Sequence, residues 1–341
     1  MKQFGTIIMT IVMLGTALPQ TTFAASKQEN IFYYYPSTDG YKSVEENYKD
    51  IDILAPQLYT VDWYLELSEA KSTDILKLAK KKKIDVMPLV VQMGFNKTLM
   101  TQLLNDEDAQ EDLIDDLIKE ARKQKYIGWQ FDFENINHLD RDKYTAFVKK
   151  AYKAFKKKRL KLSVAAVPRL KDYDKNSWDQ DWSSGTDIPA LAKNSDWVSI
   201  MSYDQPNSYG PVASIDYVQK AIDQTLKDTP ASKISLGIPL YCWQWETTAA
   251  GVTKKIANLH YQTAANTKEK YKNNSFFTTY STAAEAELFS FFKDDGSYHA
   301  IWCDNARSLE AKQDLVKKYK LRGISAWAIG QEDPEMWDVL K

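Results

Sequence analysis

YIGWQFDFENI, residues 126–136, is the stretch of this chain that decides its fold. Aromatic and polar residues alternate along it with the period of a β-strand, so Gln130, Asp132 and Glu134 project from one face. Helical patterns precede and follow the stretch, and a strand between two helices is usually buried on both faces. Carboxylates two residues apart on a buried strand cost several kcal/mol unless they are paired, hydrogen-bonded or protonated. We therefore interpret Asp132 and Glu134 as a catalytic pair, with a satisfied buried network as the alternative.

The composition indicates an ordinary globular protein. With 341 residues, 44% of them hydrophobic and 27% charged, the chain can form one large domain or two small ones. Its formal net charge of -1 gives no reason to expect nucleic acid or an anionic membrane as a partner. Its scattered histidines and cysteines match no metal-site spacing, and it has no glycine-rich phosphate loop. We expect a monomer without metal or cofactor.

Residues 1–24 have the pattern of a secretory signal peptide. Lys2 supplies a positive charge, an apolar run follows, and Thr22 and Ala24 place small residues at the two positions that a signal peptidase reads. Cleavage after Ala24 would place the mature chain, 25–341, outside the cytoplasm, in the medium or the cell envelope. A retained membrane anchor is the alternative, although the apolar run is short for a bilayer span.

The two cysteines are candidates for a disulfide. Outside the cytoplasm such a bond can persist. Cys242 and Cys303 are the only cysteines of the chain. Because sequence does not show whether they are close in space, their pairing stays open at this point.

Short apolar runs alternate with helical patterns along the mature chain. Strands interleaved with helices in this way predict a (β/α)8 barrel, since a doubly wound open sheet would need a nucleotide-binding loop that is missing. We expect strands at 30–36, 51–57, 84–91, 129–134, 160–167, 196–203, 234–241 and 323–329, and helices at 72–82, 107–123, 140–157, 216–226 and 308–318.

The last two expected strands are separated by far more residues than a barrel loop and helix need. Within this interval, 276–277, 287–292 and 298–303 have the pattern of short strands, with a turn between the last two. We expect a small inserted α+β subdomain at about 248–306, carried by one catalytic barrel over 25–341.

In such a barrel the catalytic groups come from the carboxyl ends of several strands. The expected ends hold few acids and many amides and aromatics, in a chain with 20 Tyr, 13 Phe and 10 Trp. Aromatic rings form flat walls for sugar rings, so this lining suits a neutral, acetamido-bearing polysaccharide, although any one ring could simply fill the barrel top. The candidate binding residues are Tyr34, Gln57, Tyr59, Gln92, Gln130, Met201, Tyr203, Asp204, Tyr241, Trp243 and Trp327, with Pro168 and Arg169 at a further strand end.

Several of these segments resemble glycoside hydrolase family 18 over about residues 30–341. The fourth strand of that family carries Asp-Gly-x-Asp-x-Asp-x-Glu, to which residues 128–134 are similar. MSYD at 201–204, LGIPLY at 236–241 and Trp327 also resemble segments of the family as a whole. DFEN at 132–135, DNARS at 304–308 and RGIS at 322–325 are most similar to the bacterial branch that contains spore-cortex-lytic glucosaminidases.

The resemblance implies a role for each acidic and aromatic residue of the site. Glu134 would be the general acid, and Asp132 and Tyr203 would hold the acetamido group of the substrate. Asp204 would line the same subsite, and Trp327 would form its floor. A carboxylic acid beside an ionised neighbour in an apolar cleft has a raised pKa, which suits a proton donor near neutral pH.

The family uses the acetamido group of the substrate as its nucleophile, so the resemblance implies retaining hydrolysis of β-1,4 bonds after N-acetylglucosamine. Peptidoglycan, chitin and N-glycans all remain open as substrates. Ile127 and Gln130 stand in place of the first two aspartates of the family pattern, although an amide at the Gln130 position is common in the bacterial branch. A catalytically silent sugar-binding barrel is the competing class, and Glu134 argues against it.

Overall fold

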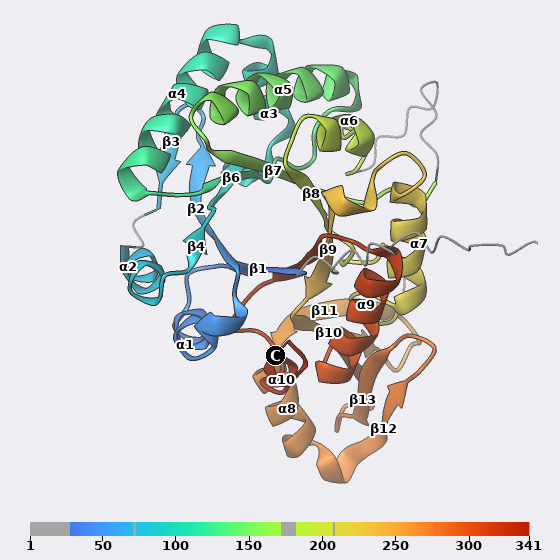
Figure 1. The fold of residues 1–341 in the computed structure, drawn as a ribbon. Coiled ribbons are helices and arrows are strands. Elements are labelled where there is room, and N and C mark those ends of the chain that lie inside the picture. Colours follow the sequence, from blue (N-terminus) through green and yellow to red (C-terminus); the bar gives the residue numbers. More distant parts are fainter. Residues whose placement is uncertain (1–27, 71–72, 172–181, 207–208, 341) are drawn as a thin grey trace, which may run out of the picture.

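The protein folds as a closed (β/α)8 barrel of parallel strands, which confirms the predicted fold class. The computed structural model describes residues 28–70, 73–171, 182–206 and 209–340. The last strand pairs with the first, Gly323 opposite Glu29, and Figure 1 shows helices arranged around the closed sheet. The strands around the barrel are β1 (Glu29–Tyr34), β2 (Ile53–Val61), β5 (Leu89–Gln92), β6 (Gly128–Phe131), β7 (Lys161–Ala166), β8 (Trp197–Ile200), β9 (Ile234–Pro239) and β15 (Gly323–Trp327).

Amphipathic helices cover the barrel, and α4 (Glu107–Gln124) illustrates why they form. Asp106 caps it by accepting a hydrogen bond from the Ala109 N–H at 2.9 Å, and acidic residues follow where the helix dipole favours them. Leu113 and Leu117, at helical spacing, are buried against the barrel. The other helices around the barrel are α1 (Thr38–Asn47), α2 (Thr73–Lys82), α3 (Lys97–Asn105), α5 (Arg141–Lys157), α6 (Ile188–Lys193), α7 (Ile215–Thr225), α9 (Ala306–Tyr319) and α10 (Met336–Val339).

Alternate residues of a barrel strand face two different cores. On β1, Tyr33 belongs to the cluster inside the barrel, together with Leu89 and Trp197. Its neighbours Phe32 and Tyr34 pack in the larger cluster between the barrel and the helices. Because side chains alternate with a period of two, a shift of one residue decides whether a side chain can reach the barrel interior.

Some strand boundaries differ from the sequence-based expectation. The strand expected at 84–91 is divided at Pro88, which has no N–H to donate, into β4 (Asp85–Val86) and β5. β2 continues to Val61 because a short strand, β3 (Leu67–Glu69), pairs with its last residues. Tyr241 does not end the seventh barrel strand but begins a strand of a second sheet.

This second sheet is antiparallel, lies between β9 and β15 in the chain, and sits beside the barrel (Figure 1, orange). Cys242 and Cys303 are register partners on two of its strands and form a disulfide. Helix α8 (Tyr261–Lys270) places Ala264 in a small core with Phe289. In spatial order the strands are β11 (Thr253–His260), β10 (Tyr241–Thr247), β14 (Tyr298–Cys303), β13 (Ala286–Phe292) and β12 (Ser275–Ser281).

Two ion pairs stabilise the fold. One connects residues that are distant in the chain, and the other is deeply buried. Arg322, just before β15, donates two hydrogen bonds to the Glu29 carboxylate at the start of β1, at 2.8 and 3.0 Å. Lys312 of α9 is fully buried and pairs with the buried Asp304, which follows the disulfide residue Cys303. The first pair joins the two ends of the barrel, and the second joins α9 to the end of β14.

The predicted signal peptide, 1–24, lies outside the described residues and stays a prediction. Among the helices that the structure does describe, none has the length and apolar character that a bilayer crossing requires.

Candidate active site

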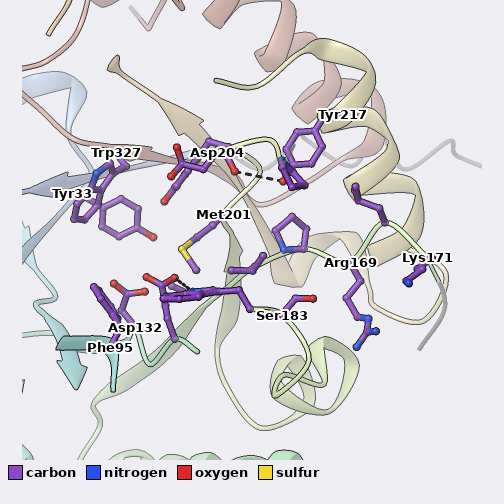
Figure 2. A pocket seen from close by; sticks show the side chains of 18 of the residues that line it. Tyr33, Phe95, Asp132, Arg169, Lys171, Ser183, Met201, Asp204, Tyr217 and Trp327 are labelled. Atoms are coloured by element: carbon purple, nitrogen blue, oxygen red, sulfur yellow. Dashed lines mark hydrogen bonds between the residues drawn. The ribbon is translucent and has the colours of Figure 1, made fainter. Parts of the chain in front are cut away.

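A cavity of about 930 Å³ lies at the carboxyl ends of the barrel strands, where (β/α)8 proteins bind their ligands. Figure 2 shows Tyr33, Asp132 and Met201 on one side of this space and Arg169 and Lys171 on the other. The cavity is lined by Tyr33, Gln57, Phe95, Asp132, Glu134, Ala165, Val167, Pro168, Arg169, Leu170, Lys171, Trp182, Ser183, Met201, Tyr203, Asp204, Pro206, Tyr217 and Trp327.

The two acids stand directly after β6, where the strand alternation continues. Asp132 and Glu134 line the cavity, whereas Phe133 between them is buried in the outer core. The Asp132 N–H donates to the Val90 carbonyl at 2.9 Å. The Gln92 side chain accepts from the Glu134 N–H at 3.2 Å and donates to the Glu134 carbonyl. Neighbouring β5 therefore fixes the backbone at both acids, one through its main chain and one through a side chain.

Burial raises the pKa of both acids. For Asp132 burial is the main cause and the nearby Glu134 charge adds to it, so the pKa lies well above its ordinary value. Oδ1 of Asp132 is buried and accepts no hydrogen bond from any described residue. For Glu134 burial again dominates; the Trp182 N–H, 2.6 Å from Oε2, acts in the opposite direction, and Asp204 raises the pKa further. Two acids whose pKa values are raised beside a cavity suit proton transfer.

The segment after β8 supplies a second polar wall. Burial raises the pKa of Tyr203, so its hydroxyl stays a hydrogen-bond donor at neutral pH. Asp204 adopts a left-handed backbone conformation with φ of 53°, which turns the chain at the cavity. The Tyr241 hydroxyl donates to Oδ1 of Asp204 at 2.6 Å. The carboxylate of Asp204 is thus fixed by the second sheet.

Trp327, at the end of β15, closes one side of the cavity. It packs against Tyr33 with ring centroids 5.6 Å apart. Both rings line the cavity, so they present an aromatic surface next to Asp132. Gln57 and Met201, two of the candidate binding residues, also line the cavity.

Three residues that were predicted to bind substrate do not line the cavity. Tyr34 faces the helices, and its neighbour Tyr33 occupies the cavity instead. Tyr59 should face inward by alternation, but a register shift after Gln57 turns it outward, where its hydroxyl lies 2.9 Å from that of Tyr126. Trp243 is buried in the outer core and carries the Lys255 ammonium over its ring at 4.3 Å.

Three other predicted residues lie behind the cavity wall. Gln92 and Tyr241 hold the residues that do line the cavity, as described above. Gln130 points into the barrel below Asp132 and donates to the Ser199 hydroxyl at 2.9 Å. Ser199 in turn is 2.9 Å from Ser325. Where the family pattern has an aspartate, this barrel therefore contains a neutral amide in a serine network.

Besides Tyr33 and Tyr217, two aromatic cavity residues in irregular segments were not predicted from the sequence. Phe95 follows β5 in a left-handed conformation, and its carbonyl accepts from the Asn135 side chain at 3.2 Å. Trp182 lies between β7 and α6. Both stand in irregular segments, where no periodicity identifies a buried face. The only signal for Phe95 was its position shortly after β5, and Trp182 lies too far beyond β7 to give even that signal. Within the described ranges no cluster of acids, histidines or cysteines could hold a metal ion.

A closed barrel with an acid pair at the mouth of its fourth strand is the arrangement expected of a glycoside hydrolase. The family model described as Glycosyl hydrolases family 18 matches residues 19–332, and the chain belongs to that family.

Relatives and solved structures of similar proteins agree. The uncharacterized glycosylase YvbX of Bacillus subtilis is 26% identical over 97% of each chain. The cortical fragment-lytic enzyme of Bacillus subtilis is 28% identical over 79% of this chain and 62% of its own, so this chain spans less than two thirds of that relative. The spore cortex-lytic enzyme SleL of Bacillus megaterium is 25% identical, with a TM-score of 0.81 over 92% of this chain and 73% of the other.

Proposed function

We propose that the protein cleaves β-1,4 bonds after N-acetylglucosamine in peptidoglycan, with chitin as the alternative polymer, by a substrate-assisted mechanism. The observation that carries this proposal is Glu134, a cavity carboxyl whose pKa is raised by burial next to a second buried acid. The names of the cortex-lytic relatives favour peptidoglycan. We also infer that 1–24 is removed on export, that the mature chain 25–341 is a catalytic barrel with an insertion at about 248–306, and that it acts outside the cytoplasm.

In the first step Glu134 is the general acid. It gives its proton to the glycosidic oxygen while the bond between that oxygen and the anomeric carbon breaks. The acetamido carbonyl oxygen of the same sugar bonds to the anomeric carbon, which turns the attack into an intramolecular one. The product is a bicyclic oxazolinium ion and a free leaving sugar, so no second carboxylate is needed to attack the sugar.

In the second step Glu134 is the general base. Its carboxylate takes a proton from water, and the water oxygen bonds to the anomeric carbon as the bond to the acetamido oxygen breaks. The acetamido group is regenerated, Glu134 is again protonated, and the β configuration is retained.

Asp132 and Tyr203 hold the acetamido group, and Trp327 supports the sugar from below. Burial raises the pKa of Asp132, which opposes its ionisation. The positive oxazolinium ion acts in the opposite direction, because an opposite charge at close range stabilises the ionised carboxylate. An ionised Asp132 next to the acetamido group therefore stabilises the intermediate.

Purified protein incubated separately with peptidoglycan, chitin and N-glycans tests this proposal, with products identified by mass spectrometry and the fresh anomer by NMR. We expect reducing-end N-acetylglucosamine in the β configuration, and no cleavage of a fully deacetylated polymer because the nucleophile is gone. A thiazoline mimic of the intermediate should inhibit. Equal rates on acetylated and deacetylated polymer, or an α product, would refute the mechanism, and no cleavage of any polymer would favour a silent binding barrel.

A further inference from the structure

Trp182 contacts Glu134, the candidate proton donor, directly. Its indole N–H donates to Oε2 of Glu134 at 2.6 Å. It reaches Glu134 from a different strand end, since it lies between β7 and α6. The side chain is also 46% exposed, so the same ring that holds Glu134 presents a large apolar surface at the cavity.

The residues that follow Trp182 anchor it against the chain just beyond Glu134. Gly185 packs so closely on Ile136 that an added Cβ would lie 2.4 Å from the Ile136 carbonyl oxygen. The carbonyl of the fully buried Ser184 accepts from Arg141 at 2.7 Å, at the start of α5. The position of Trp182 is therefore set by packing onto the same segment that carries Glu134.

This geometry gives the two carboxyl oxygens of Glu134 different roles. An oxygen that accepts an N–H at hydrogen-bond distance cannot at the same time direct a proton toward that donor. The carbonyl oxygen of a protonated carboxyl group is the better acceptor of an N–H, so the contact of Trp182 with Oε2 favours Oε1 as the oxygen that carries the catalytic proton. As Glu134 releases this proton, negative charge develops on the carboxylate and the bond from Trp182 becomes charge-assisted and stronger.

We propose that Trp182 is a positioning residue for Glu134: its N–H fixes the carboxyl group so that Oε1 faces the glycosidic oxygen, and its exposed ring is the surface on which the leaving sugar packs. This inference rests on the proposed role of Glu134 as the general acid. It assigns separate tasks to the N–H and to the ring, so the two can be removed separately.

Replacement of Trp182 by Phe keeps an aromatic ring and removes the N–H. The Trp182 N–H stabilises the negative charge on Glu134 in the transition state, so its loss in Trp182→Phe should lower kcat by about ten- to a hundredfold. KM should change by less than about threefold, since the ring remains. Trp182→Ala also removes the surface for the sugar, so its KM should rise as well. Trp63→Phe is the matched control, since Trp63 is 56% exposed and does not line the cavity.

The pH profile of kcat/KM gives a readout that a purely structural role would not move. The Trp182 N–H stabilises ionised Glu134, so its loss should raise the pKa of Glu134 and shift the basic limb to higher pH. The other ionisable groups around the cavity are the same in the variant and in the wild type. They are Tyr33, Asp132, Arg169, Lys171, Tyr203, Asp204 and Tyr217.

A double-mutant cycle with Glu134→Gln completes the test. If Trp182 acts through Glu134, adding Trp182→Phe to Glu134→Gln should lower the residual kcat by less than threefold. A Trp182→Phe variant with wild-type kcat and an unmoved basic limb would overturn this inference while leaving Glu134 as the acid. An equal loss in both backgrounds would overturn it too. Full activity of Glu134→Gln alone would instead overturn the proposed function.

Discussion

Replacement of Glu134 by Gln removes the transferable proton of this site and keeps the shape and the hydrogen bonds of the side chain. The amide has the shape of the carboxyl group, and its oxygen can still accept the Trp182 N–H. The backbone at this position is held by Gln92 through two hydrogen bonds that the substitution does not touch. We therefore expect a normally folded variant that still binds substrate and lacks only the transferable proton.

The loss of turnover follows from the loss of general acid catalysis. Such catalysis contributes roughly two to four powers of ten. At about 1.36 kcal/mol for each factor of ten, the barrier should rise by about 2.7–5.4 kcal/mol. KM should stay close to that of the wild type, because substrate contacts are retained.

The same substitution should stabilise the fold in a pH-dependent way. A carboxyl group whose folded-state pKa is raised contributes stability at low pH, and this contribution is lost as the pH rises through the folded pKa. Burial raises the pKa of both Glu134 and Asp132 in this direction. Glu134→Gln removes one of these groups and the charge that raises the pKa of the other. Its melting temperature should exceed that of the wild type at neutral pH, and the two should converge in acid.

Hydrolysis of a reporter glycoside across pH, calorimetric binding of an N-acetylglucosamine oligomer and thermal melts at acid and neutral pH test these expectations together. Turnover within tenfold of the wild type would remove Glu134 from the mechanism. A lower melting temperature at neutral pH would show that the carboxyl group is held by favourable contacts instead of being destabilised by burial.

Three further variants test other parts of the structure. Asp132→Asn should lose turnover severely, measured as kcat at the pH optimum, because the amide cannot carry the negative charge that faces the oxazolinium ion; near-normal kcat would contradict this. Trp327→Ala should weaken oligosaccharide binding more than it lowers the melting temperature, whereas a collapse in melting temperature with binding intact would make it a core residue. Lys312→Met should lower the free energy of unfolding by about 3–5 kcal/mol in urea titrations, since it leaves buried Asp304 without its partner; an unchanged value would contradict the ion pair.

The features that sequence could predict are those that repeat along the chain. The alternation of strands and helices led to the barrel, and the two-residue period after Gly128 placed Asp132 and Glu134 on one face, where both do line the cavity. Periodicity works here because buried strands and amphipathic helices satisfy the same burial requirement many times.

The features that sequence missed depend on single events. One register shift after Gln57 turns Tyr59 away from the barrel interior, and no composition signal marks it. A one-residue difference in which side chains of β1 face the barrel interior exchanges Tyr34 for Tyr33. Trp182 reaches Glu134 through packing between segments that are distant in the chain, so its contact exists only in the folded protein. Errors of this kind are therefore expected to concentrate at the mouth of the barrel, where irregular segments meet.

The pairing of β1 with β15 also dictates an order of events during folding. The Arg322–Glu29 contact spans 293 positions, nearly the full described chain. Contacts of such separation carry a large loop-closure cost and form late, so β1 and β9 keep an open edge each until the final strand docks. Open edges invite pairing with other chains. A nonsense mutation just before Gly323 should thus produce an aggregating open sheet instead of a weakened enzyme, even though Asp132 and Glu134 would be intact in the truncated chain.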